Sequence, residues 1–331
     1  MFVISGVYRI VLSLFLILAL ISIPSDILWD RNNYLYYAEN ADKIIRSYDG
    51  IGELLFNDYI FLEMNRILAF SLNPENIVLT FLVFSLAIFY FLINKFSINF
   101  ITFTVGLFLS ILITPILHLE VVAIRQALGM SVILLFLVYS KNNKAILVGF
   151  LVASLIHSSF FLLTLLFFLD SFLFDKFEKR IKILLNFATI LTISICYLII
   201  ASYLGFRQVE LYASYDGSVS GGTFIVVLVL FIYLYFYYEK TNYNFLYNYV
   251  LQGFLLFLIF YIFSNASVSA RFLESIFPAF ILLLVNKFRK FEVIIILFLF
   301  LAYGYVWFNN GQYIIFEVSQ MQADYALQGL L

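Results

Sequence analysis

Apolar runs of about twenty residues recur along almost the whole chain and are separated by short polar breaks. A run of roughly 17–25 apolar residues is the length that a helix needs to cross the hydrocarbon core of a bilayer. The runs are continuous rather than alternating, which argues against a transmembrane β-barrel. The sequence therefore predicts an all-α polytopic integral membrane protein, with residues 1–331 forming a single membrane domain.

Composition supports this class. Of 331 residues, 64% are hydrophobic and only 12% are charged, which is too little polar cover for a soluble surface. The net charge of −1 gives no indication of nucleic-acid binding. The single cysteine, Cys196, lies inside an apolar run and cannot form an intrachain disulfide. No metal-ligand spacing or nucleotide-binding motif occurs, so no metal or cofactor is expected.

One apolar segment is too long for a simple span. The segments lie near residues 5–24, 76–94, 97–116, 121–140, 145–173, 181–203, 222–238, 245–264, 272–287 and 291–308. If 145–173 were one span, the following loop "DKFEKRIK" would face outside, against the preference of Lys and Arg for the cytoplasmic face. If it is a hairpin that turns at His157–Ser159, 12 of the 19 basic residues, including nine of the ten lysines, lie inside. We therefore predict about 11 transmembrane passes, including a short re-entrant hairpin near 145–173.

The outer face then carries arginine rather than lysine. Its basic residues are Lys43 and the arginines Arg31, Arg46, Arg66, Arg125, Arg207 and Arg271. A planar guanidinium is well suited to bind phosphate or diphosphate oxygens. The alternative is that topology selection keeps lysine inside and leaves arginine outside by default. Two outer loops are expected: residues 25–75, with an interfacial amphipathic helix near 54–71, and residues 204–221.

Arg125 and His157 are the strongest candidates for a site. Arg125 begins an apolar helix at its outer end, where the helix N-terminus also favours an anion; a snorkelling side chain is the alternative. His157 lies at the predicted turn beside serines, where it can serve as a proton acceptor, as a phosphate partner when protonated, or only as a capping residue. Arg271 is a further candidate, and its alternative is an ion pair with Glu274 one helical turn later.

The outer loops supply candidates for sugar binding. Acidic, amide and tyrosine side chains together offer the hydrogen-bond partners and stacking faces that a sugar needs. In the first loop these are Asp30, Asn33, Tyr34, Asp58 and Glu63, and the second loop contributes Arg207. For each single acid the alternative is a solvated loop residue.

Several of these stretches resemble the EpsG/Wzy type of bacterial polysaccharide polymerase. They are "WDRNNYLYY" at 29–37, "NDYIFLEMNRIL" at 57–68, "RQALGMSVILLFLVY" followed by "KNNKAILVGFLVASLIHSS" within 125–159, and "SARFLES" at 269–275. The resemblance implies an integral membrane glycosyltransferase, without cofactor, in the bacterial cytoplasmic (inner) membrane. It would join oligosaccharide repeat units carried on undecaprenyl diphosphate, as donor and acceptor, at the outer face. Membrane lipid and a protein that regulates chain length are the further partners implied.

By this resemblance Arg125, His157 and Arg271 form the catalytic set, and Asp30 joins them as a possible base. In such a transfer the lipid diphosphate gains negative charge as it leaves, and guanidinium groups would stabilise that charge. A base must also take the acceptor hydroxyl proton; His157 ranks first, with Asp30 and Asp58 as alternatives.

Two other functions remain open from the sequence. A lipid-linked-sugar glycosyltransferase or ligase would use the same outer residues, with Asp26 and Asp30 as an acidic pair for a divalent metal. A flippase or transporter would need polar residues along a path through the membrane and an internal repeat. The polar residues cluster at one face, and no clear repeat is present.

Overall fold

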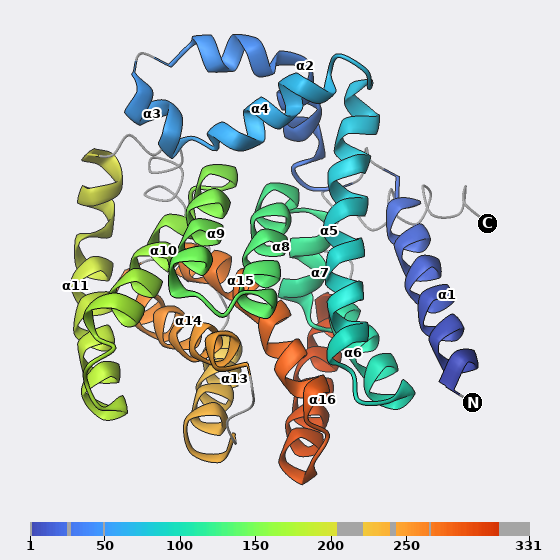
Figure 1. The fold of residues 1–331 in the computed structure, drawn as a ribbon, viewed down its shortest axis with the longest axis vertical. Helices are drawn as coiled ribbons and strands as arrows, with labels where there is room; N and C mark the ends of the chain where they lie inside the picture. Colours follow the sequence, from blue (N-terminus) through green and yellow to red (C-terminus); the bar gives the residue numbers. More distant parts are fainter. Residues whose placement is uncertain are drawn as a thin grey trace. The chain divides into compact units, whose positions relative to one another are not determined.

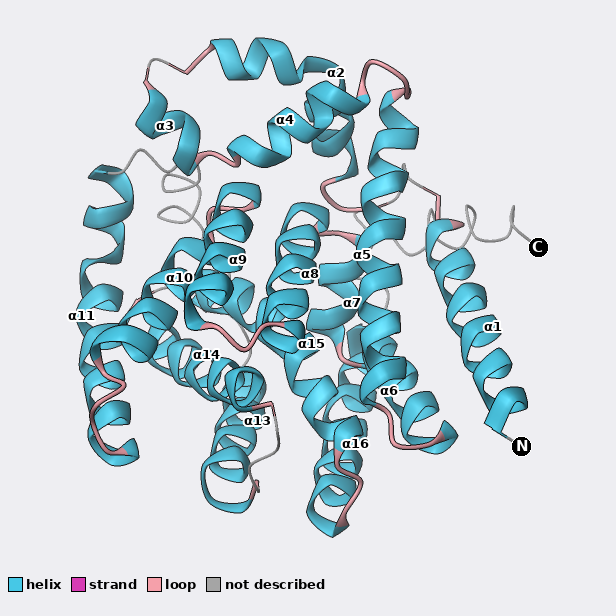
Figure 2. Cartoon of the chain, in the orientation of Figure 1, coloured by secondary structure: helices cyan, strands magenta, loops and turns pink. Residues whose placement is uncertain are grey.

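The computed structural model describes residues 2–24, 28–48, 50–203, 221–238, 243–264 and 266–310. Helices form almost all of this part of the chain, and no β-strand is assigned within it (Figures 1 and 2). The helices are α1 (Phe2–Ile21), α2 (Arg31–Arg46), α3 (Ile51–Phe56), α4 (Tyr59–Leu68), α5 (Pro74–Phe96), α6 (Phe100–Leu112), α7 (Thr114–Val121), α8 (Ile124–Tyr139), α9 (Asn143–Ile156), α10 (Phe160–Phe168), η2 (Leu169–Leu173), α11 (Lys179–Tyr203), α13 (Gly221–Ile232), η3 (Tyr233–Tyr237), α14 (Asn244–Phe263), α15 (Ala266–Asn286) and α16 (Lys290–Asn310). The all-α prediction is confirmed.

The chain divides into two compact units. The first contains Met1–Ile44, Leu62–Ser131 and Phe280–Leu331, and the second contains Ile45–Phe61 and Val132–Ala279. Both units are therefore assembled from segments far apart in the sequence.

In the first unit, α1 and α6 pack on α5, and α16 packs on α6. Local sequence fixes where α5 and α6 begin. The Asn73 side chain accepts the Asn76 N–H at 2.9 Å ahead of Pro74, and Asn99 and Thr102 form a reciprocal capping box. The Arg9 guanidinium donates to the Asn94 side chain at 3.2 Å and attaches α1 to α5.

The predicted segment 97–116 is not one straight helix. α6 and α7 are bent by 78° at Ile113, and Pro115 lies in the first turn of α7. Proline is accepted there because the first helical N–H groups have no intrahelical partner. The break leaves carbonyl groups at the end of α6, and the Trp307 indole N–H donates to the Leu112 carbonyl at 2.8 Å.

In the second unit, α9 and α10 form an antiparallel hairpin that turns at His157–Ser159, as the sequence predicts. A hydroxyl pair, Ser154 and Thr164, joins the two helices at 2.7 Å. The Phe150 and Phe167 rings stack with centroids 4.8 Å apart. α14 packs against α11 and α13 in the same unit. The re-entrant position of the hairpin in a membrane stays a prediction.

Close packing of α8 on α9 depends on Gly149. A Cβ built on this glycine would lie 2.4 Å from the Phe136 ring and 2.8 Å from the Phe136 Cβ, so a rotamer change of Phe136 cannot relieve the clash. We expect Gly149→Ala to destabilise the protein by about 1–3 kcal/mol, measured as a lower Tm in detergent. The matched variant Gly304→Ala, where nothing lies within 4 Å of the new Cβ, should not lower the Tm. Equal Tm values for the two variants would contradict this packing.

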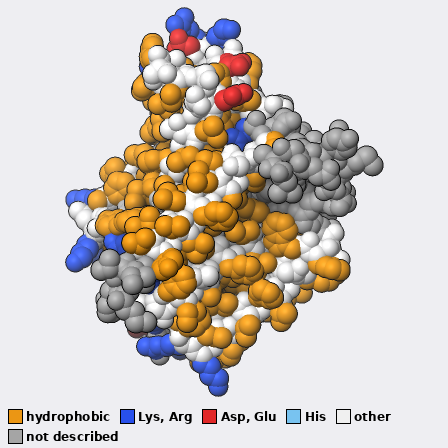
Figure 3. All heavy atoms as spheres, turned by 90° about the vertical axis from the view of Figure 1, so that its right-hand side faces the viewer, with side chains coloured by type: hydrophobic (Ala, Val, Ile, Leu, Met, Phe, Trp, Pro, Cys, Tyr) orange, Lys and Arg blue, Asp and Glu red, His pale blue; other side chains and the backbone are white. Residues whose placement is uncertain are grey.

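Within the described part of the chain, five helices are long and apolar enough to cross a membrane, or six if the bent pair α6 and α7 counts as one span. The other apolar helices, including α8, α9 and the α10–η2 segment, have 10–17 residues. The expectation of about 11 passes is therefore not confirmed, because many of the apolar runs form helices shorter than a full span. Large hydrophobic side chains face outward on several helices, among them Phe15 on α1 and Phe300 on α16. Figure 3 shows a face on which hydrophobic side chains predominate.

Candidate functional site

The turn between α9 and α10 meets an acidic residue from the first predicted outer loop. α3 ends at Phe56 and α4 begins at Tyr59, so the expected helix over 54–71 is interrupted between them. Asp58 occupies this break with a φ of 64°. That left-handed conformation is accessible to Asp and Asn but costly for most other side chains. The interruption presents the Asp58 carboxylate to the turn, and α3 packs on α9 in the same unit.

Asp58 contacts both neighbouring residues of the turn. Its Oδ1 accepts the Ser158 backbone N–H at 2.8 Å and lies 3.5 Å from Nδ1 of His157. The second distance is long, so the His157 contact is not a closed hydrogen bond. Both side chains are largely buried, with about a tenth of each exposed. The sequence places them 99 residues apart, and only the fold brings them together.

Two buried polar atoms of this turn lack hydrogen-bond partners among the described residues. They are Nδ1 of His157 and Oγ of Ser159. Leaving a buried donor or acceptor unsatisfied costs about 1–3 kcal/mol, so each such group needs an explanation. A substrate hydroxyl or a small shift of Asp58 toward His157 would satisfy them. The arrangement of carboxylate, imidazole and hydroxyl suits proton transfer to or from a bound hydroxyl group.

Arg271 and Glu274 lie in the same unit, on α15. Nη1 of Arg271 donates to Oε2 of Glu274 at 3.4 Å, which is the i, i+3 ion pair given above as the alternative for Arg271. The Arg271 side chain is 32% exposed and Glu274 is 10% exposed. The Arg271 side chain is therefore only partly buried at this pair.

In the first unit, Arg125 joins the start of α8 to α2. Its Nη1 donates to the Tyr37 hydroxyl at 3.4 Å, and its guanidinium carbon lies 4.9 Å from the Tyr37 ring centroid and 5.7 Å from that of Tyr34. These are cation–π distances. The guanidinium is thus held by two aromatic rings of the predicted outer loop.

Arg31 was predicted only as one of the outer-face arginines, and the structure places it at the start of α2, close to Tyr34. Arg31 is only 5% exposed at the start of α2. Burial lowers its pKa from the ordinary arginine value, and the neighbouring Tyr34 opposes that shift. An arginine remains protonated at neutral pH in spite of such a shift. Arg31 is near the substrate candidates Asn33 and Tyr34 in the sequence, but its burial could not be predicted from composition.

The other candidates of this unit make local contacts. The Asn33 amide donates to Oδ1 of Asp30 at 3.1 Å, and the Asp30 carbonyl accepts the Tyr34 N–H, so Asp30, with a φ of 59°, is bonded to the first turn of α2. Glu63 pairs with Arg66 one turn later on α4. Arg207, with most of the predicted second outer loop, lies outside the described residues. Among the described residues no group of three or more His, Cys, Asp or Glu side chains is placed to hold a metal ion.

Comparison with known protein families identifies the family of the chain. The model of a family described as the EpsG family matches residues 7–319. No curated protein and no solved structure matches the chain.

Proposed function

The chain belongs to the EpsG family, and on this premise we propose that it is a polysaccharide polymerase of the bacterial cytoplasmic membrane. It would join oligosaccharide repeat units carried on undecaprenyl diphosphate, acting at the outer face. The observation that carries this proposal is the pairing of Asp58 with His157 at the buried α9–α10 turn. It supplies a base for a sugar hydroxyl inside a membrane protein of this family.

The proposed step is a glycosyl transfer. The acceptor hydroxyl attacks the anomeric carbon of the donor sugar, and the bond from that carbon to the diphosphate oxygen breaks. The acceptor proton passes to Nε2 of His157, while Nδ1, which faces Asp58, carries the other ring proton. The Asp58 carboxylate stabilises the imidazolium that forms, as an acid beside a catalytic histidine does in other enzymes. The lipid diphosphate leaves with the electron pair of the broken bond.

The leaving group needs its own stabilisation. Diphosphate gains negative charge as the bond breaks, and guanidinium donors held in place beforehand stabilise that charge most strongly. Arg125 is our candidate, because Tyr34 and Tyr37 fix its guanidinium. The buried Arg31 adds a second positive charge near Tyr34. The partly exposed Tyr37 ring also offers a stacking face for a sugar, whereas Tyr34 is only 3% exposed. A protein that regulates chain length is the further partner of this proposal.

Reaction of the purified protein with synthetic undecaprenyl-diphosphate repeat units tests the proposal. We expect a ladder of products longer than one repeat unit on a gel, with release of undecaprenyl diphosphate. Products that stop after the addition of one sugar would instead favour the lipid-linked glycosyltransferase or ligase. Transfer of intact units across vesicle membranes without any new glycosidic bond would favour the flippase and contradict the proposal.

A further inference from the structure

A second polar feature lies in the second unit, well away from the α9–α10 turn. A cavity of about 200 Å³ opens between η2, α11 and α14. Its polar lining includes Asp170 and Asn186, which are buried, and Asp175, which is exposed. Asp170 follows His157 by 13 residues along α10 and η2. At about 1.5 Å per residue, the cavity lies roughly 20 Å from the turn.

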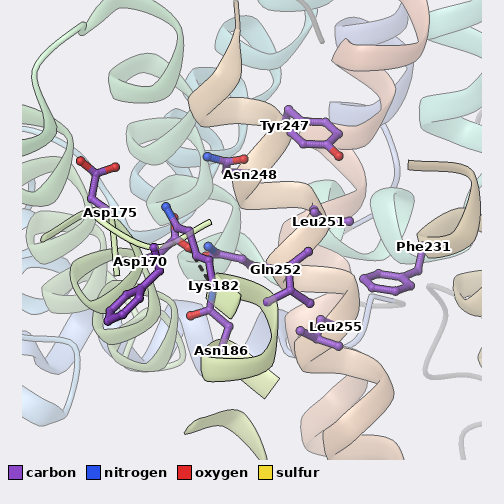
Figure 4. Close-up of a pocket in the computed structure, with 12 residues that line it drawn as sticks. Asp170, Asp175, Lys182, Asn186, Phe231, Tyr247, Asn248, Leu251, Gln252 and Leu255 are labelled. Carbon is purple, nitrogen blue, oxygen red and sulfur yellow. Dashed lines mark hydrogen bonds and ion pairs between the residues drawn. The ribbon is translucent and has the colours of Figure 1, made fainter. Parts of the chain in front are cut away.

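The charges inside this cavity already compensate one another. Nζ of Lys182 lies 2.8 Å from Oδ2 of Asp170, and the Asn186 amide donates to Oδ1 of the same carboxylate at 2.9 Å. Figure 4 shows these three side chains close together on one wall. An added anion would be repelled by Asp170 and by the exposed Asp175, whereas an added cation would compete with Lys182 for Asp170. A neutral ligand avoids both costs.

One acceptor of this wall is unused. Oδ1 of Asn186 is buried and has no hydrogen-bond partner among the described residues, although the residue is only 2% exposed. Gln252 and Asn248, from the neighbouring turns of α14, line the same cavity with further amide groups. Amides both donate and accept hydrogen bonds, so this wall is matched to a ligand that does the same. Hydroxyl groups have that property.

The opposite wall is apolar. Leu251, Leu255 and Phe231 line it, and Figure 4 shows them grouped on the other side from the ion pair. A ligand that fills the cavity must therefore be polar along one edge and apolar on the other face. A sugar ring has this form, with hydroxyl groups around its edge and C–H groups on its faces.

We propose that the cavity between η2, α11 and α14 binds one neutral sugar ring through Asn186 and Gln252, as a site separate from the α9–α10 turn. The ring is either a free monosaccharide or the terminal residue of a larger glycan. This assignment is independent of the polymerase function, because it rests on the lining of the cavity alone.

Binding to the purified protein tests the assignment. The protein is kept in nanodiscs, because many detergents carry sugars. Saturation-transfer NMR titrations use glucose, galactose, N-acetylglucosamine and N-acetylgalactosamine, with their methyl glycosides as a second arm, and glucuronate and glucosamine as charged analogues. We expect at least one neutral sugar to bind, and the charged analogues to bind more weakly. Free sugars and glycosides binding alike would indicate a free ring; preference for the glycosides would indicate a larger glycan.

Two variants locate the binding. Gln252→Met keeps the side-chain length and leaves intact both the Asp170–Lys182 ion pair and the Asn186–Asp170 hydrogen bond. It should weaken binding about tenfold through the lost hydrogen bonds. Asn186→Leu should abolish binding; if it fails to fold, Gln252→Met alone decides. The control Thr192→Val changes an exposed residue of α11 outside the cavity and should bind normally, as should His157→Gln. No binding of any neutral sugar, unchanged affinity in Gln252→Met, or tighter binding of a charged analogue would overturn the assignment.

Discussion

Replacing His157 with glutamine is expected to lower polymer formation by about 10²–10⁴-fold, while the amount of protein in the membrane stays normal. A positioned general base contributes a factor of this size, and glutamine keeps a polar side chain at the turn without a group that takes a proton. The measurement is the rate of chain extension from synthetic lipid-diphosphate repeat units, with the Tm as a check on folding. His118→Gln is the matched control, because His118 is the other histidine of the chain.

Asp58→Asn removes the negative charge of residue 58 but keeps its hydrogen bond to the α9–α10 turn. Asparagine can still accept the Ser158 N–H and tolerates the positive φ of this position. The Tm should therefore hold, while the rate falls at least about tenfold, because the imidazolium loses its carboxylate. Asp58→Ala should lose stability as well, since the Ser158 N–H is then left without its acceptor.

The double variant Asp58→Asn, His157→Gln decides whether the two residues act as a unit. If they do, its rate should be no lower than that of His157→Gln alone. Losses that multiply in the double variant would show that Asp58 acts apart from His157. Wild-type rates in His157→Gln would remove the histidine from the mechanism.

Arg125→Lys is expected to reduce polymer formation about 10²–10³-fold at normal protein levels. Lysine keeps the charge but has no planar group to lie over Tyr34 and Tyr37, and it offers no fork of donors to a diphosphate. The size of the loss is that of removing one donor aimed at developing negative charge. The measurement is again the extension rate, together with release of undecaprenyl diphosphate.

Two further variants are compared with Arg125→Lys. Arg66→Lys changes an exposed arginine that pairs with Glu63, and surface pairs of this kind contribute little; its rate should stay within about twofold of wild type. Tyr37→Phe removes the hydroxyl that accepts from Arg125 but keeps the ring, so its loss should be smaller than that of Arg125→Lys. An Arg125→Lys protein that makes normal polymer would exclude a role for the guanidinium.

Much of the fold could be predicted from local sequence. Run length indicated membrane helices, and the charge distribution identified 145–173 as a hairpin that turns at His157–Ser159, where α9 and α10 meet. The number of passes could not be predicted in this way, because an apolar run does not reveal whether it forms a full span, a short helix or a bent pair. The 78° bend at Ile113 is such a case, and its freed carbonyl group is satisfied by Trp307, from a distant helix.

The sequence by itself determined the class of the protein and several members of its candidate site, because run length, charge bias and residue type are local properties. Only the tertiary structure brought Asp58 to His157 and placed Tyr37 against Arg125, and only it buried Arg31 and enclosed the cavity lined by Asn186 and Gln252. Helical periodicity specifies which side chains share a face, but the partner of that face depends on how separate helices pack. Contacts between residues that are 88 or 99 positions apart therefore depend on the packing of separate helices.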